Sequence, residues 1–245
     1  ITLQTGLFVL VLAPEVYWPI RQVSAHFHAA SDGVEAAARV FEILEKPIAN
    51  GKAEITKIDG ISWSDLKVSF ENRGSVLIPA ANLKSGEINL ISGPSGSGKS
   101  TLISILLGFN KDYEGDVLLH LGGQSFNLRE VNNEFLHKQL SWLSQEPHFQ
   151  NASIFEILKQ VNPALTLIDA EKLLESVGLS KIDMPGGVNT KVGGLNDALS
   201  FGQRRKVALA RAIAKPSSVV ILDEPSASVD DASEAVISEV IKKLS

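Results

Sequence analysis

Gly93-Pro94-Ser95-Gly96-Ser97-Gly98-Lys99-Ser100-Thr101 is the stretch that decides the fold of this chain of 245 residues. The apolar residues 88–92 before it predict a short strand, and residues 102–107 after it predict a helix. A strand, a G-x-x-x-x-G-K-S loop and a helix in this order are typical of a phosphate-binding (Walker A) loop. The alternative is a Gly- and Ser-rich turn that matches by chance, which average residue usage puts on the order of one in a hundred. The stretch therefore predicts an α/β fold that binds a nucleotide.

The residue types of this loop suit phosphate chemistry. Glycines let the backbone curl so that successive N–H groups point at phosphate oxygens, and the N-terminus of the following helix adds partial positive charge. In such a loop the ammonium of Lys99 would bridge the β- and γ-phosphates, and the hydroxyl of Ser100 would bind Mg²⁺. We therefore expect residues 93–101 to form the nucleotide site.

A second motif would supply the metal ligand and the group that activates water. Residues 218–222 form a continuous apolar run, typical of a parallel strand covered on both faces, and Asp223-Glu224-Pro225 follows it. Carboxylates at the carboxyl end of such a strand point into the ligand crevice of an open α/β sheet. Asp223 would hold Mg²⁺, directly or through water, and Glu224 would orient and deprotonate the attacking water. The simpler alternative is a pair of solvated carboxylates at a strand end.

A further helix start suited to anions lies between these two motifs. Leu199-Ser200-Phe201-Gly202-Gln203 precedes a helix predicted over residues 204–214. Ser200 suits the N-cap of that helix, and Gly202 lets a ligand approach its first turn. One domain rarely needs two such helix starts for one nucleotide. With the phosphate loop and the acidic pair, this motif makes the sequence similar to the nucleotide-binding domain of ABC transporters.

The resemblance covers nearly all of residues 58–245 and implies roles for several of them. The family's L-S-G-G-Q signature loop closes on the γ-phosphate held by the other domain of a head-to-tail dimer, which implies that Ser200, Gly202 and Gln203 bind ATP across the dimer. Ser144-Gln145-Glu146-Pro147 matches the Q-loop, so Gln145 is implied to contact Mg²⁺ and the attacking water and to sense the transmembrane domain. Asp230 matches the D-loop, which works across the dimer interface. ATP and Mg²⁺ are the implied cofactors.

The fold that the resemblance implies is that of a P-loop NTPase with a RecA-like core, an antiparallel β subdomain and a helical subdomain. Val68-Ser69-Phe70 would belong to the antiparallel subdomain, which meets the adenine. Residues 147–216 would form the helical subdomain.

The N-terminal residues 1–46 differ in character from the rest. Residues 7–13 (LFVLVLA) are too short to span a bilayer and leave two interpretations open, the end of a membrane helix or a buried core helix. Helical spacing of apolar residues predicts an amphipathic helix over 19–45, and helix-breaking residues predict a linker over 47–57. The segment resembles the last transmembrane helix and intracellular extension of the thiol-reductant exporter subunits needed for cytochrome bd assembly. That second resemblance implies a thiol such as glutathione or cysteine as the exported solute.

The chain departs from the family pattern at several positions. Phe201 stands where the signature has Gly, and Gly194 replaces an acidic residue that usually contacts the membrane domain. Asn72 stands where an aromatic residue usually stacks on adenine, so stacking is either absent or supplied by Phe70. The family's switch histidine would lie beyond Ser245, and we therefore expect the sequence to be a fragment.

Composition and charge narrow the class of partner. The chain has 23 Lys and Arg against 28 Asp and Glu, a net charge of −5, and such a chain is not expected to coat nucleic acid. It contains no cysteine, which excludes disulfides and thiolate metal sites. We expect the ATPase domain of an ABC exporter at the cytoplasmic face of the inner (plasma) membrane. Its partners would be a second ABC subunit, its own transmembrane domain and a transported small molecule.

Two other functions remain open at this point. One is a degenerate module that occludes ATP within a heterodimeric exporter, which Asn72 and Phe201 favour and the retained Glu224 disfavours. The other is a soluble ABC ATPase of translation or DNA repair, which the apolar N-terminal segment and the acidic charge disfavour.

Overall fold

The structure is a computed structural model that describes residues 2–45, 50–70, 74–180, 182, 184, 186–194, 199–227 and 229–244. The chain divides into two compact units, Ile1–Ala49 and Asn50–Ser245. Each unit is described by itself below.

The first unit is one helix, α1 (Leu3–Glu45), of 43 residues. The helix was predicted to begin near Pro19, but α1 continues through Pro14 and Pro19. A proline inside a helix removes one hydrogen bond and crowds the carbonyl four residues earlier, but the flanking residues still adopt the helical conformation here. Within this chain the large residues in 7–12 are 40–75% exposed. Among the described helices, none has a stretch that is both long and apolar enough to cross a bilayer.

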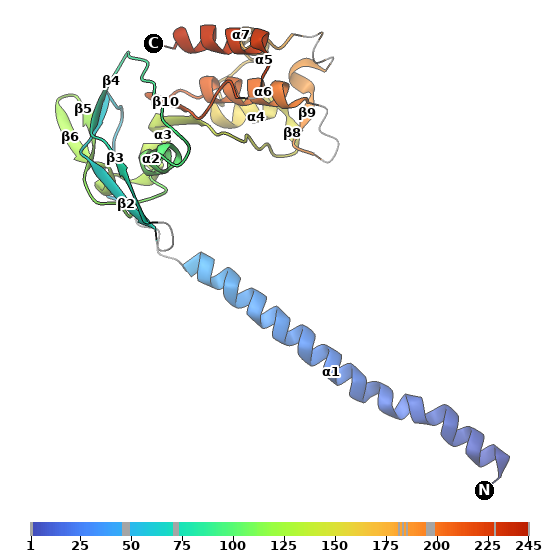
Figure 1. Ribbon diagram of the computed structural model, residues 1–245. Helices are drawn as coiled ribbons and strands as arrows, with labels where there is room; N and C mark the ends of the chain where they lie inside the picture. Colours follow the sequence, from blue (N-terminus) through green and yellow to red (C-terminus); the bar gives the residue numbers. More distant parts are fainter. Residues whose placement is uncertain are drawn as a thin grey trace. The chain divides into compact units, whose positions relative to one another are not determined.

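The second unit begins with antiparallel strands (Figure 1). A four-stranded sheet has the order β4-β1-β5-β6, formed by β1 (Gly60–Trp63), β4 (Ala81–Lys84), β5 (Val117–Leu121) and β6 (Gln124–Asn127). A separate antiparallel pair joins β2 (Leu66–Phe70) to β3 (Gly74–Ile78), which confirms the antiparallel placement of Val68-Ser69-Phe70. Residues 47–49 of the predicted linker lie outside the described residues. The described remainder packs against this unit, because Ala53 bridges to Val131 and Ile55 is buried.

A parallel pair, β7 (Leu140–Leu143) and β10 (Val219–Leu222), confirms the predicted strand before Asp223. Its residues are half-buried rather than buried as predicted. The strand predicted over 88–92 is wrong, since the described residues 87–94 form no strand and Leu90 is 90% exposed. A strand requires hydrogen-bonded neighbours, which the apolar pattern alone does not supply. A groove of ≈ 540 Å³ lies between this segment and β10.

Helices surround the parallel pair. The helix after the phosphate loop is α2 (Lys99–Leu106), and α3 (Asn133–Gln139) precedes β7. The range 147–216 contains β8 (Ala152–Ser153), α4 (Ile154–Val161), α5 (Leu167–Ser176), β9 (Lys191–Val192) and α6 (Phe201–Ala214), followed by α7 (Asp231–Lys242). Short 3₁₀ turns lie at Leu128–Glu130 and Gly187–Asn189. Buried residues form two cores, one between α2 and the antiparallel strands and one among α4, α5, α6 and α7.

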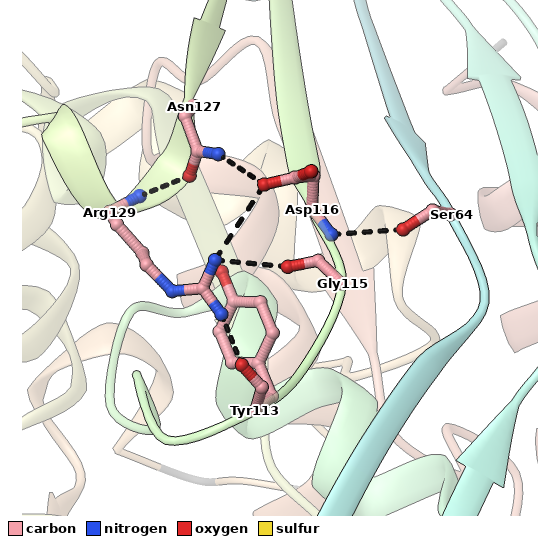
Figure 2. Close-up of polar contacts among 6 residues, drawn as sticks. All are labelled: Ser64, Tyr113, Gly115, Asp116, Asn127 and Arg129. Atoms are coloured by element: carbon pink, nitrogen blue, oxygen red, sulfur yellow. Dashed lines mark hydrogen bonds and ion pairs between the residues drawn. The ribbon is translucent and has the colours of Figure 1, made fainter.

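A polar network fixes the loop that leaves α2 and returns to β5 (Figure 2). The guanidinium of Arg129 lies 3.8 Å from the centre of the Tyr113 ring and donates to the carbonyls of Tyr113 and Gly115. Asn127 donates to the Asp116 carboxylate at 2.8 Å, and the Asp116 amide donates to the Ser64 hydroxyl at 2.9 Å. This network ties the loop between α2 and β5 to residues at the ends of β1 and β6.

Candidate nucleotide-binding site

The phosphate loop ends at the first turn of α2. Gly98 is the N-cap, with φ +96°, a left-handed conformation that favours glycine. A Cβ added at Gly98 would lie 2.6 Å from a methyl carbon of Val76, so the loop approaches β3 too closely for a larger residue. No side chain caps the helix, which leaves its first N–H groups to a ligand. The predicted loop therefore has the backbone conformation that an anion site needs.

A cavity of ≈ 680 Å³ lies over this loop. Its lining combines the loop with residues from three other segments: Phe70, Val76, Gly93, Ser95, Gly96, Gly98, Lys99, Ser100, Thr101, Gln145 and Glu224. The Lys99 ammonium donates to the carbonyls of Gly93 at 2.7 Å and Pro94 at 3.0 Å, which holds its charge at the loop. The predicted lysine, the Q-loop glutamine and the predicted general base therefore all line the same cavity.

The acidic pair and the Q-loop meet at the ends of β10 and β7. The Gln145 side-chain amide donates to the Glu224 carboxylate at 2.9 Å. Burial and then the neighbouring Glu224 carboxylate raise the pKa of Asp223, while the charges of Arg205 and Lys99 act in the opposite direction. Two carboxylates crowded in this way are stabilised by a cation.

The donor set at this point fits Mg²⁺. Ser100, Gln145 and Asp223 offer hydroxyl, amide and carboxylate oxygens, the ligand type that this hard cation prefers. Within the described part of the chain, no cluster of three or more His, Cys, Asp or Glu residues could hold a metal on its own. The ligands would therefore be completed by phosphate oxygens and water, as is usual for Mg²⁺ bound with a nucleotide.

The helix start at Ser200 is confirmed as an N-cap. The Ser200 hydroxyl accepts from the Gln203 amide at 3.2 Å, and the Gln203 side chain accepts from the Ser200 amide at 2.9 Å, a reciprocal capping box. Phe201 is 49% exposed at the first helical position. Among the described residues that line the phosphate-loop cavity, none belongs to 199–203. The structure therefore does not bring Ser200, Gly202 and Gln203 to the cavity of their own chain.

Asp230 serves as the N-cap of α7. Its carboxylate accepts from the amide of Ser233 at 2.8 Å and from the hydroxyl at 3.0 Å, and these bonds lower the pKa of Asp230. The predicted adenine-side position Asn72 lies outside the described residues, as does Ser228 of the D-loop. Phe70, the alternative stacking residue, is 40% exposed and lines the cavity.

Sequence reasoning missed two residues of the site, Val76, which lines the cavity, and Arg205, which bonds residues that line it. Arg205 is the more informative of the two. Its side chain is 1% exposed, and its guanidinium donates to backbone carbonyls of Gln145 and of residues 223–225. The signal was an arginine on the same face of α6 as Ala208, Leu209 and Ala212, which are all buried. A helix rarely buries a cation unless that cation is fully hydrogen-bonded.

Comparisons with known proteins agree with this geometry. The chain is 32% identical over 253 residues to the glutathione/L-cysteine transport system ATP-binding/permease protein CydD of Escherichia coli K12, covering 100% of this chain and 42% of that protein. It is 33% identical to CydC of Bacillus subtilis 168, over 100% of this chain and 43% of that protein. An ATP-dependent lipid A-core flippase of Francisella tularensis is 30% identical over 95% of this chain and 38% of the flippase. The chain therefore spans less than half the length of these relatives.

A solved structure shows the same fold. The structure of a bacterial Atm1-family ABC exporter with ATP bound matches 99% of this chain and 43% of that chain, with a TM-score of 0.73 and 20% identity. The family profile described as ABC transporter matches residues 79–227. Because that match spans more than half of the chain and contains the phosphate loop, Gln145, the helix start at Ser200 and the acidic pair, the chain belongs to the ABC transporter family.

Proposed function

We propose that this chain is the ATP-binding and ATP-hydrolysing domain of an ABC exporter. The observation that carries this proposal is the convergence of Lys99, Gln145 and Glu224 on the cavity over the phosphate loop. A lysine at the loop, a hydrogen-bonding glutamine and a carboxylate in the same cavity are groups that phosphoryl transfer to water uses.

Each of these residues has a separate task in hydrolysis. The backbone of residues 93–101 and the Lys99 ammonium bind the phosphates and place the γ-phosphorus. Gln145 orients the attacking water, and the Glu224 carboxylate takes a proton from it as the oxygen attacks the γ-phosphorus and the bond to the ADP oxygen breaks. The hydrogen bond between the Gln145 and Glu224 side chains places these two groups side by side before a nucleotide enters.

Ser100, Gln145 and Asp223 would hold Mg²⁺ in this proposal. Mg²⁺ bound there supplies positive charge that neutralises the β- and γ-phosphate oxygens. The raised pKa of Asp223 fits this role, because the ionised carboxylate is under-stabilised until a cation is bound.

The partners follow from the arrangement of the helix starts. Since Ser200, Gly202 and Gln203 do not line the cavity of their own chain, they would bind the γ-phosphate held by a second ABC subunit in a head-to-tail dimer. ATP binding would close the dimer, hydrolysis would open it, and a transmembrane domain attached to the N-terminal unit would move the solute. The names of the CydD and CydC relatives support glutathione or cysteine as that solute, with the domain at the cytoplasmic face of the inner membrane.

One observation favours an alternative. Phe201 is exposed at the helix start where the family pattern has glycine, and its ring would lie where the partner's nucleotide approaches. A subunit of this kind can occlude ATP without supporting turnover in the partner's site. Glu224 is retained, so the site in this chain keeps its base.

Nucleotide binding and turnover test the proposal separately. Calorimetry with MgATP should show binding by the parent and loss of most of the affinity in Lys99→Ala, since Lys99 is the side-chain cation that lines the cavity. In a preparation that hydrolyses ATP, Glu224→Gln should bind ATP but turn it over far more slowly, and an ATP-stabilised dimer should accumulate. Equal affinity in Lys99→Ala contradicts the phosphate site, and parental turnover in Glu224→Gln contradicts the base.

Transport of the solute requires its own experiment. Inverted vesicles carrying the natural protein should take up labelled glutathione or cysteine when ATP is added, and Lys99→Ala should abolish that uptake. If ATP increases the uptake of neither glutathione nor cysteine, the proposal that the solute is a thiol is contradicted.

A further inference from the structure

We propose that Arg205 is a positioning residue that holds the backbone of Gln145, Asp223 and Glu224 in the arrangement needed to bind Mg²⁺ with ATP. The inference rests on the proposed function. It adds a residue of α6 that binds the backbone carbonyls of the residues proposed to hold Mg²⁺ and activate water. Arg205 itself does not line the cavity, so it acts on the site and not on the nucleotide.

The geometry is that of a clamp with one cation and four acceptors. Nε of Arg205 donates to the Pro225 carbonyl at 3.0 Å, and Nη1 donates to the Gln145 carbonyl at 3.1 Å. Nη2 donates to the Asp223 carbonyl at 3.3 Å and also to the Glu224 carbonyl. All three guanidinium nitrogens are therefore used, and every acceptor belongs to the Q-loop or to the segment after β10.

These acceptors lie just beyond the ends of two paired strands, where the strand pairing no longer fixes the backbone. Gln145 follows β7 and Asp223 follows β10, so the regular ladder between the two strands has just ended. Glu224 has φ +49°, a left-handed conformation that a residue with a Cβ adopts at a cost of about 1 kcal/mol or more. The guanidinium binds the carbonyls on both sides of this strained residue and joins them to the Q-loop.

The clamp sets the backbone from which the functional side chains project. The Gln145 side-chain amide also donates to the Glu224 carboxylate at 2.9 Å. The Q-loop and the segment after β10 are therefore joined twice, once through Arg205 and their backbone carbonyls and once through their own side chains. A shift of either segment would separate the oxygens of Gln145 and Asp223 that would bind the metal. The phosphate loop belongs to a different segment and makes none of these bonds, so phosphate binding should survive loss of the clamp.

Arginine suits this position better than other residues. Its planar fork carries five N–H donors, whereas lysine offers one nitrogen and glutamine offers one amide. Its positive charge also opposes the rise in the pKa of Asp223 that burial and Glu224 cause. The Phe201 ring, one turn earlier on α6, lies 5.9 Å from the guanidinium carbon and covers it.

The competing explanation is that Arg205 only stabilises the core. Arg211 provides a matched control, because it lies on the same helix and donates to a backbone carbonyl, that of His148 at 3.2 Å, outside the cavity. If Arg205 has a purely structural role, Arg205→Met and Arg211→Met variants of similar stability should change the gain in ATP affinity from Mg²⁺ to a similar extent. A positioning role predicts an effect on Mg²⁺ that only Arg205 variants show.

The test measures ATP affinity by calorimetry with Mg²⁺ and with EDTA, in the parent, Arg205→Lys, Arg205→Gln, Arg205→Met and Arg211→Met. In Arg205 variants the gain in affinity that Mg²⁺ supplies should fall by about 10- to 100-fold, the usual cost of removing a residue that orients metal ligands. Affinity in EDTA should stay close to that of the parent, and Arg211→Met should keep the full gain from Mg²⁺. If Arg205→Met does not fold, the Lys and Gln variants decide.

Hydrogen exchange gives a readout that needs no nucleotide. The Ala227 amide donates to the Glu224 carbonyl and the Asp223 amide donates to the Leu143 carbonyl, so both report on the clamped segment. Both amides should exchange faster in Arg205→Lys than in the parent and in Arg211→Met. A folded Arg205→Lys with parental exchange and a parental gain from Mg²⁺ overturns the proposal. A parent that binds no ATP overturns the proposed function instead, and its exchange data still show whether the clamp exists.

Discussion

Phe70 is the aromatic residue among the described side chains that line the phosphate-loop cavity. We predict that Phe70→Ala lowers ATP affinity by about 5- to 150-fold, because stacking of a base on an aromatic ring is worth roughly 1–3 kcal/mol. GTP affinity should fall in parallel, since stacking does not read the edges of the base. Calorimetric titration measures both, with Phe109→Ala as a control, because Phe109 is exposed but does not line the cavity. An unchanged affinity in Phe70→Ala would mean that another segment covers the adenine.

Asp223, a proposed Mg²⁺ ligand, also affects how the stability of the folded chain depends on pH. Its pKa is raised, chiefly by burial and then by Glu224, so the folded chain binds this proton more tightly than the unfolded chain. Its contribution therefore favours folding below the ordinary aspartate pKa and is lost as the pH rises through the raised value. We predict that Asp223→Asn raises the melting temperature of the nucleotide-free protein at pH 8, with a smaller gain at pH 5. Scanning calorimetry at the two pH values decides, and a gain independent of pH would show that charge is not the cause.

Two serine caps allow a role of Ser200 in ATP turnover to be separated from its role in helix stability. Ser200 caps α6 in a box with Gln203, and Ser153 caps α4 in the same way with Glu156. Replacing either serine with alanine should cost about 1 kcal/mol of unfolding free energy in denaturant titration. We predict that Ser200→Ala also slows ATP turnover in the dimer, whereas Ser153→Ala leaves it unchanged. Equal turnover in the two variants would limit Ser200 to a capping role.

Local features of the sequence predicted local structure well. The helix after the phosphate loop, the cap at Ser200 and the strand before Asp223 each depend on residues close in sequence, and all were confirmed. The strand expected over 88–92 failed because a ladder depends on distant partners. Arg205 was missed for a similar reason, since its acceptors lie 18 to 60 positions away in sequence. The start of α1 was misplaced because the amphipathic spacing begins only near residue 19, whereas the apolar residues before it continue the same helix.

The two units of the chain differ in what stabilises them. Both buried cores draw their members from residues 53–241, whereas the large apolar side chains of α1 that the structure describes are exposed. We predict that a protein of residues 50–245 unfolds cooperatively at the midpoint of the whole chain. Thermal melts followed by circular dichroism at a helical wavelength and by tryptophan fluorescence test this, since Trp63 is buried in the second unit. A clearly lower midpoint for residues 50–245 would show that the first unit supports the second.

Because Glu224 has a left-handed backbone, the residue that would be most stable at this position differs from the residue that ATP turnover requires. Glycine would adopt φ +49° without the steric cost that any Cβ brings, so Glu224→Gly should make the protein easier to fold while removing the carboxylate. A library of variants screened only for expression or heat resistance would therefore tend to enrich glycine at this position, and its best-behaved members would bind ATP without consuming it. Screens on this chain need a turnover step from their first round.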